Sequence, residues 1–323
     1  MFSIVIPLYN KAHIIERTLD SVFGQTFTHF EIIVVDDGST DNGGEIITAT
    51  EKFKSVRLIK QVNQGVSMAR NNGIAMTNFN YVALLDGDDE WMPNFLEEMA
   101  KAVQQFPEAG FYGSSSWHRN IITKEQAEHT PEKYKGKIQV FDFFENPHQM
   151  PHTSAVVINK KIFNTIFPSG VGFPAGMKVM EDHACFYQIA FASPVVYIGF
   201  PLGIRNNCVE GQVTGLSKEE RGKLIQYNTA FYNLIFSVWK KAAKQPKNYL
   251  PFFKYDLRCI IISLLRINDF KTIEYFIGGL QQECRSNLTL IEQKLYPNAS
   301  VKVLSMMYIY YTKIWWKIFH AKK

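Results

Sequence analysis

Cysteine is scarce in this sequence and shows no paired spacing. The four cysteines among 323 residues (Cys185, Cys208, Cys259 and Cys284) stand far apart and form no C-x-x-C motif. Closely spaced cysteines are typical of zinc sites, and disulfide frameworks are typical of small secreted chains. The sequence therefore argues against both and favours a reducing compartment.

Long apolar runs are also missing. No stretch of about 18 uninterrupted apolar residues occurs, so the sequence predicts no transmembrane helix. Met1 leads directly into the strand-like SIVIPLYN, without the basic start and apolar core of a signal peptide. We therefore expect a cytoplasmic protein.

An excess of charge is absent from most of the chain. The net charge is +5, and residues 301–323 contain five lysines and no acidic residue. The remainder carries 30 basic and 30 acidic residues (35 minus 5, against 30), so it is neutral. A neutral body argues against nucleic acid as the main partner, whereas a basic tail indicates an anionic surface.

That tail reads as an amphipathic helix over residues 302–320. At about 100° per residue, its lysines and His320 share one narrow stripe, and a broad apolar and aromatic face lies opposite. This pattern is typical of a helix lying in a membrane interface, so we expect a peripheral protein at the inner face of the membrane. The same face could instead pack on the protein core or in a dimer contact.

The first half of the chain alternates strand-like and helical segments. Apolar strands are predicted at 2–8, 30–35, 56–60 and 81–85, with helices between them and after the last, including one capped by Asn10 that runs to Phe23. Further strands are predicted at 109–115, 152–158 and 195–200, and a helix at Glu181. This order predicts an α/β fold with a mostly parallel central sheet.

From about residue 216 the pattern becomes helical. Helices are predicted at 217–243, 249–267, 270–282 and 300–319. We therefore expect one domain at 1–215, followed by an α-helical C-terminal region at 216–323.

Two acidic clusters follow predicted strands. Asp36-Asp37 ends the second strand, and Asp86-Gly87-Asp88-Asp89 ends the fourth. The carboxyl ends of parallel strands meet at one edge of a sheet, where ligands gather. Carboxylates at such an edge suit Mg²⁺ or Mn²⁺. The alternative is a pair of solvated turns that cap helices.

Five motifs in this order resemble those of a family 2 inverting glycosyltransferase with a GT-A fold. They are SIVIPLYN, VVDDGSTD, NQGVSMARNNGI, LLDGDDEWMP and MEDH. The resemblance covers roughly residues 1–215. It implies a GT-A nucleotide-binding domain, a nucleotide-sugar donor and a divalent cation, Mn²⁺ or Mg²⁺.

The resemblance also implies roles in donor binding. The first-strand residues Pro7, Leu8 and Tyr9 would line the nucleotide pocket. Asp37 would accept a hydrogen bond from the base, or else it belongs to a turn that caps the next helix. Gly65 permits close approach of the backbone. Arg70 would lie near the diphosphate, or else pair with a neighbouring acid.

Further residues match the reacting end of such a site. In the D-x-D motif, Asp88 would bind the metal and Asp86 would hold the ribose or sugar. Asp182 would be the general base that takes a proton from the acceptor hydroxyl, and Glu181 would hold the sugar. The alternative for both is that they are acids favoured in the first turn of a helix. Arg205, expected after the last strand, would contact phosphate.

The resemblance implies an inverting transferase that moves a sugar, from a UDP-sugar above all, to a glycan or lipid-linked acceptor in bacterial surface polysaccharide synthesis. One alternative is a nucleotidyltransferase on a similar fold, but PLYNKAH lacks the Gly-rich basic loop which that chemistry uses. Another is a non-catalytic carbohydrate-binding module, against which Asp88 and Asp182 argue.

Overall fold

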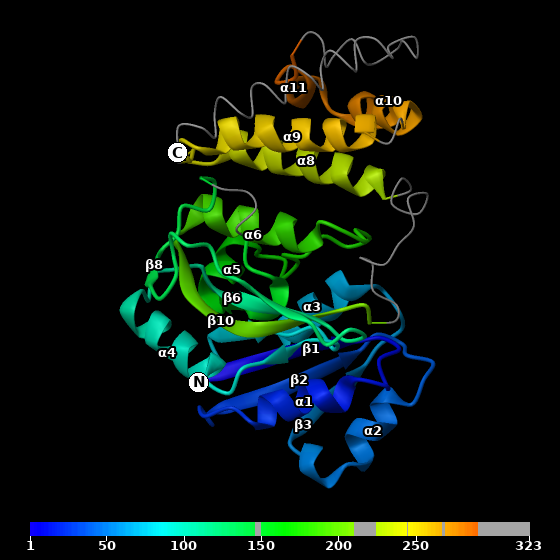
Figure 1. Cartoon of the computed structure of the whole chain (residues 1–323), viewed down its shortest axis with the longest axis vertical. Coiled ribbons are helices and arrows are strands. Elements are labelled where there is room, and N and C mark those ends of the chain that lie inside the picture. The colour runs from blue at the N-terminus through cyan, green and yellow to red at the C-terminus, as the bar shows by residue number, and fades with distance from the viewer. Residues whose placement is uncertain (146–149, 210–223, 244, 267–268, 290–323) are drawn as a thin grey trace. The chain divides into compact units, whose positions relative to one another are not determined.

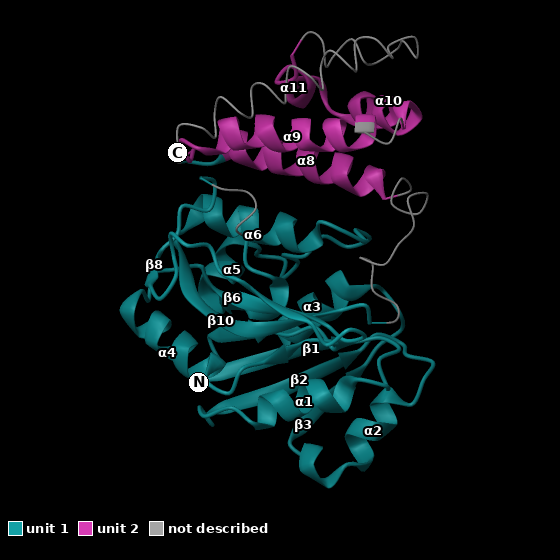
Figure 2. Ribbon diagram, in the orientation of Figure 1, with its two compact units in different colours: residues 1–216, 242–244 teal, residues 217–241, 245–323 magenta. Residues whose placement is uncertain are grey.

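The computed structural model describes residues 1–145, 150–209, 224–243, 245–266 and 269–289 (Figure 1). The chain divides into two compact units, residues 1–216 with 242–244 and residues 217–241 with 245–323 (Figure 2). Domains at 1–215 and 216–323 remain our proposal. The predicted amphipathic helix of the tail lies outside the described residues.

Unit 1 is built on four parallel strands. They are β1 (Phe2–Leu8), β2 (Phe30–Asp36), β3 (Val56–Lys60) and β4 (Tyr81–Leu84). Their order is β3-β2-β1-β4, so β1 lies inside the sheet and is buried along nearly its whole length. The carboxyl ends of β1, β2 and β4 therefore share one edge, as the sequence predicts.

The second half of this sheet is mixed. It adds β5 (Glu90–Trp91), β6 (Phe111–Asn120), β7 (Gln126–His129), β8 (Ile138–Val140), β9 (Val156–Asn159) and β10 (Val195–Asn207). Strand β9 lies antiparallel between β4 and β6, and β10 returns parallel to β6. The mostly parallel α/β sheet is confirmed, with β9 as an antiparallel insertion within it.

Helices cover the faces of the sheet. They are α1 (Ile15–Phe23), α2 (Gly43–Ala49), α3 (Val66–Ala75), α4 (Phe95–Gln105), α5 (Lys160–Ile166) and α6 (Glu181–Ala192), with the short turns η1 (Glu51–Phe53) and η3 (Thr153–Ala155). Helix α3 packs so closely on β1 that a Cβ on Gly73 would come within 2.4 Å of Val5 Cγ1.

Three local predictions are wrong. The strand expected at 152–158 begins only at Val156, because Thr153–Ala155 form the turn η3. Helix α1 begins at Ile15 rather than at Asn10. Asn10 instead has φ 51°, and its side-chain oxygen accepts a hydrogen bond from the Thr40 N–H at 2.8 Å, which ties two loops at the sheet edge. Strand β10 continues to Asn207, so Arg205 lies within a strand and not after it.

Unit 2 is helical, which confirms that prediction for the part of the chain that is described. It contains α8 (Ile225–Lys241), α9 (Tyr249–Arg266), α10 (Phe270–Gly279) and α11 (Gln282–Arg285). Its core is aromatic, with Tyr232 against Phe253 and Phe276. Among the described helices, none combines the length and apolar character needed to cross a membrane.

Candidate functional site

A cavity of about 550 Å³ opens at the shared edge of β1, β2 and β4. Ten of the eleven residues that the sequence analysis selects line it: Pro7, Leu8, Tyr9, Asp37, Gly65, Arg70, Asp86, Asp88, Glu181 and Arg205. Lys11, Asp89 and His152 line it as well. Asp182 is not among the lining residues, although it directly follows Glu181.

The Asp37 carboxylate organises the loop that leads into α3. Its Oδ1 accepts hydrogen bonds from Gln61 Nε2 at 2.7 Å and from the Gln64 N–H at 2.8 Å, and its Oδ2 accepts one from the Gly65 N–H at 2.8 Å. Gly65 has φ 86°, a conformation that favours glycine. The preceding Asp36 closes a separate turn, in which its Oδ1 accepts from the Ser39 N–H at 2.9 Å. A carboxylate offers about four lone pairs, so Asp37 retains capacity for a further donor.

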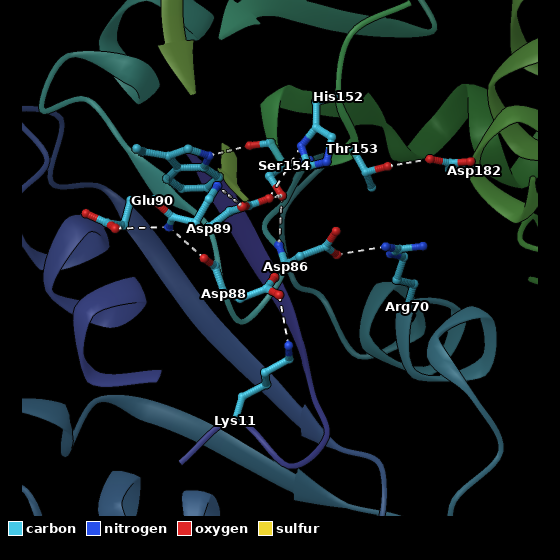
Figure 3. A network of polar contacts seen from close by, with 12 residues as sticks. Lys11, Arg70, Asp86, Asp88, Asp89, Glu90, His152, Thr153, Ser154 and Asp182 are labelled. Atoms are coloured by element: carbon cyan, nitrogen blue, oxygen red, sulfur yellow. Dashed lines mark hydrogen bonds and ion pairs between the residues drawn. The ribbon is translucent and has the colours of Figure 1, made fainter. Parts of the chain in front are cut away.

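Arg70 is buried on α3 and pairs with two carboxylates. Its Nη2 donates to Asp86 Oδ1 at 2.7 Å, and its Nη1 donates to Glu181 Oε1 at 2.9 Å (Figure 3 shows the pair with Asp86). Burial opposes the charge of Arg70, but these two carboxylates raise its pKa above the ordinary value. Arg70 is thus a fixed cation that joins the acidic loop after β4 to the start of α6.

The acidic loop after β4 concentrates negative charge. Asp88 Oδ2 accepts from Lys11 Nζ at 2.9 Å (Figure 3). Asp89 is buried and accepts from Ser154 Oγ at 2.6 Å and from the Asn206 N–H at 2.9 Å. Burial and the charges of Asp88 and Asp86 raise the pKa of Asp89, against these two hydrogen bonds.

A divalent cation fits this loop. Ligand atoms of Asp86, Asp89 and His152 lie within 4.8 Å of one another. Burial and the nearby Arg205 charge lower the pKa of His152 to about 4, so its imidazole is neutral at pH 7. Its Nδ1 accepts a hydrogen bond from the Ser154 N–H at 3.4 Å, which a bound cation would replace. The mutual repulsion that raises the pKa of Asp89 is relieved by positive charge. Two carboxylates and one imidazole make a donor set for a divalent cation.

Asp182 is held in the first turn of α6. Thr153 Oγ1 donates to Asp182 Oδ2 at 2.8 Å (Figure 3). The His183 backbone N–H donates to Asp182 Oδ1 at 2.7 Å, and the His183 ring Nδ1 lies 2.8 Å from the same oxygen. Burial alone would raise the pKa of Asp182, but His183, Arg70 and the Thr153 hydroxyl lower it below the ordinary value. Asp182 is therefore ionised, the state in which a carboxylate accepts a proton.

One short segment joins these parts. It consists of three consecutive residues, His152, Thr153 and Ser154 (Figure 3). His152 approaches Asp89, and Thr153 donates a hydrogen bond to Asp182. The Ser154 hydroxyl donates to Asp89 and accepts from the Asp86 N–H at 3.1 Å. The sequence analysis missed this segment and Lys11. For Lys11 a local signal existed, because it directly follows PLYN at the cavity edge; for residues 152–154 there was none.

Comparisons with known proteins agree with this geometry. The family model for glycosyl transferase family 2 matches residues 3–167, just over half of the chain. An uncharacterized glycosyltransferase, alr2836 of Nostoc sp., is 30% identical over 201 residues, which are 60% of each chain. YibD of Escherichia coli, also an uncharacterized glycosyltransferase, is 44% identical over 98 residues, 30% of this chain and 28% of YibD. The chain thus spans less than two thirds of these relatives.

A solved structure has the same fold. The crystal structure of S. aureus TarS 1–349 in complex with UDP-GlcNAc superposes with a TM-score of 0.70 at 16% identity. The match covers 94% of this chain and 88% of that one. At this identity the likeness concerns the fold alone.

Proposed function

The chain belongs to glycosyl transferase family 2, a family of glycosyltransferase enzymes, and we propose that it moves a sugar with inversion from a nucleoside diphosphate sugar to an acceptor hydroxyl. We take the donor to be a UDP-sugar and the acceptor to be a glycan or lipid-linked glycan in bacterial surface polysaccharide synthesis. The observation that carries this proposal is the convergence of Asp37, Arg70, the acidic loop and Glu181 on one cavity, with Asp182 directly beside it.

The nucleotide occupies the part of the cavity near β1 and β2. Pro7, Leu8 and Tyr9 offer an apolar wall there, and Asp37 offers a free acceptor position to a base N–H. TarS, which shares the fold, is solved with UDP and with UDP-GlcNAc, and this supports UDP as the nucleotide here.

The acidic loop holds the diphosphate end of the donor. Asp88 is the proposed metal ligand, with Asp86 directed to the ribose or sugar. Asp88 itself pairs with Lys11, whereas the ligand atoms of Asp86, Asp89 and His152 lie within 4.8 Å of one another. Asp89 and His152 are therefore the further ligands of this proposal, and Asp86 is close enough to share the cation. The cation, when bound, offsets the charge of the departing diphosphate. Lys11 supplies further positive charge on the cavity wall. Arg70, committed to two carboxylates, holds Asp86 and Glu181 in place.

Asp182 is the proposed general base. It takes the proton of the acceptor hydroxyl as the oxygen attacks the anomeric carbon from the side opposite the leaving nucleotide, which inverts the configuration. Thr153 and His183 fix its carboxylate. Glu181, which lines the cavity, is the residue proposed to hold the sugar. A carboxylate with a lowered pKa is a weak base, so its proton affinity must rise during the reaction. In this proposal the acceptor hydroxyl displaces the His183 ring from Asp182, while Thr153 keeps the carboxylate in position.

Both alternative functions are less well supported. A nucleotidyltransferase would need a Gly-rich phosphate loop after β1, where this chain instead has Tyr9-Asn10-Lys11. A non-catalytic carbohydrate-binding module has no use for an ionised carboxylate held beside the cavity by a threonine and a histidine.

The test is a screen of nucleotide sugars. With Mg²⁺ or Mn²⁺ present, UDP-sugars should raise the melting temperature more than GDP- or CMP-sugars, because a ligand bound to the folded state stabilises it by mass action. The stabilising donor should then be hydrolysed slowly without acceptor. Stabilisation by nucleoside triphosphates alone would favour the nucleotidyltransferase, and donor binding without hydrolysis or transfer would favour a module.

A further inference from the structure

Three nitrogen-bearing side chains form a row across β10, β6 and β7. Arg205 on β10 is in register with His118 on β6. The His118 ring stacks on the His129 ring of β7, with centroids 4.7 Å apart and an angle of 6°. The row begins at Arg205, which lines the cavity, and ends at His129, which is exposed. We call these three residues the cationic row after Arg205, whose charge is permanent, while the two imidazoles contribute N–H donors.

The cationic row lies on the face of the sheet that carries the proposed base. Gly203, two residues before Arg205, faces Ala155 of η3, since a Cβ on it would come within 3.1 Å of Ala155 Cβ. Alternate residues of a strand share a face, so Arg205 points to the side of η3. The same turn holds Asp182 through Thr153. Asn206 points to the other face and binds Asp89 through its N–H.

Arg205 carries a positive charge that no carboxylate of the described residues neutralises by an ion pair. It is half-buried, and within the described residues it forms no ion pair, whereas the nearby Arg119 pairs with Glu90. A half-buried guanidinium without a carboxylate is stabilised by an anionic ligand. Burial, His129 and Arg205 lower the pKa of His118 to about 4, so a neutral His118 can still donate one N–H.

A metal is a poor occupant for this row. Rings stacked at 6° direct their nitrogens alongside one another and not toward a common centre. A guanidinium, which donates hydrogen bonds and accepts none, repels a cation. Donors spaced along a strip suit an oxyanion with several acceptor oxygens.

We propose that the cationic row binds a phosphate group of the acceptor and so holds the acceptor hydroxyl near Asp182. This inference rests on the proposed function and adds the class of acceptor, a sugar or polyol that carries phosphate. The phosphate can be a diester within a glycan chain or the diphosphate of a lipid carrier, and the two differ in size and charge.

The test separates this subsite from the donor site. Protein saturated with UDP and Mg²⁺ is titrated with dimethyl phosphate, for the diester, and with dimethylallyl diphosphate, for the lipid carrier; sodium sulfate serves as a comparison ion. Calorimetry gives the affinity, and imidazole NMR signals report on His118 and His129. The same titrations are run without UDP, so they remain informative if UDP fails to bind.

One of the two phosphates should bind UDP-saturated protein and shift both imidazole signals. The double variant His118→Ala/His129→Ala should weaken that binding about tenfold or more, because a hydrogen bond to a charged group is lost at each position. The variant should keep UDP affinity, which also shows that unit 1 is folded. His29→Ala, at an exposed histidine elsewhere on unit 1, is the matched control and should change neither.

Equal phosphate affinity in wild type and the double variant would overturn the proposal, as would binding of neither phosphate. If sulfate binds as tightly as phosphate and is equally unaffected by the double variant, the row takes an adventitious ion only, which also overturns it. Absence of UDP binding in wild type would contradict the proposed function instead, while the phosphate titrations without UDP would still decide the subsite.

Discussion

Replacing Arg70 by methionine would keep most of the side-chain volume and remove the guanidinium that pairs with Asp86 and Glu181. The exposed fractions of the three side chains are 4% for Arg70, 24% for Asp86 and 11% for Glu181. The substitution would therefore leave one well-buried and one partly buried carboxylate without their shared partner. Because the Arg70 side chain also lies over the Phe173 ring, at 5.4 Å from its centroid, methionine retains apolar contact there.

The expected loss of stability is at the lower end of the range for breaking a buried ion pair, about 3 kcal/mol, since Asp86 retains access to water. For a unit of this size each kcal/mol corresponds to about 2 to 4 °C in melting temperature, so unit 1 should melt about 6 to 12 °C lower. This figure concerns the transition of unit 1, which calorimetry identifies as the one that UDP and Mg²⁺ raise.

The loss should also depend on pH, through Glu181. Burial and Asp182 already raise the pKa of Glu181 above the ordinary 4.5, and Arg70 opposes that rise. Without Arg70 the pKa in the folded state is higher still. A carboxyl group with a raised folded-state pKa destabilises the fold above its unfolded pKa, and below that value the penalty vanishes. The deficit should therefore be small near pH 4.5 and larger at pH 8.

Two variants control this experiment. Arg57→Met, at an exposed arginine on β3, should change the melting temperature little. Arg70→Met/Glu181→Gln should recover part of the loss, because the second change removes the buried charge. If Arg70→Met melted like wild type at pH 8, or if the double variant were no more stable than the single one, the account of Arg70 as the clamp of this site would be refuted.

Further predictions concern the base, the metal and the tail. Thr153→Val should lower donor turnover by about tenfold or more while UDP affinity stays unchanged, because the hydroxyl positions Asp182. Thr153→Ser, which keeps the hydroxyl, should restore the turnover. A fall in UDP affinity equal to the fall in turnover would indicate general damage to the fold instead. Asp88→Ala should abolish the dependence of UDP affinity on Mg²⁺ or Mn²⁺ in calorimetry, and unchanged affinity would remove Asp88 from the metal site. The chain of residues 1–323 should float with anionic liposomes at low salt and a chain ending at Ala299 should not, since each lysine near an anionic leaflet contributes about 1 kcal/mol. Equal behaviour of the two would exclude the tail as anchor.

Much of the cavity could be predicted from the sequence, and the reason is local. Strands buried on both faces appear as short apolar runs, which located β1, β2 and β4. Their carboxyl ends must share one edge in a parallel sheet, so Asp37, Asp86 and Asp88 were expected together before any contact was known.

Contacts between distant segments could not be predicted in this way. Ser154 meets Asp89 across 65 residues and Thr153 meets Asp182 across 29, and no periodic pattern encodes either. For Arg70, the sequence analysis offered two environments, contact with the diphosphate or pairing with one neighbouring acid, and neither is complete. It lines the cavity as expected, but it is buried between two acids, one of them 111 residues away.

The end of β10 shows a different cause of error. Pro201 and Gly203 look like the end of a strand, because both residues weaken a strand interior. In the structure the register shifts at these positions and pairing with β6 then continues to Asn207. Arg205 is thereby placed in a strand, and this makes the cationic row possible.

The central claim, that Asp182 is the base of a sugar transfer, is tested most directly by turnover of the identified donor in wild type and Asp182→Asn. The substitution is isosteric, so UDP affinity should remain within about twofold, since Asp182 does not line the cavity. Release of UDP from the donor, with water or acceptor, should fall by about two to four orders of magnitude. Turnover near that of wild type, with UDP affinity intact, would contradict the account.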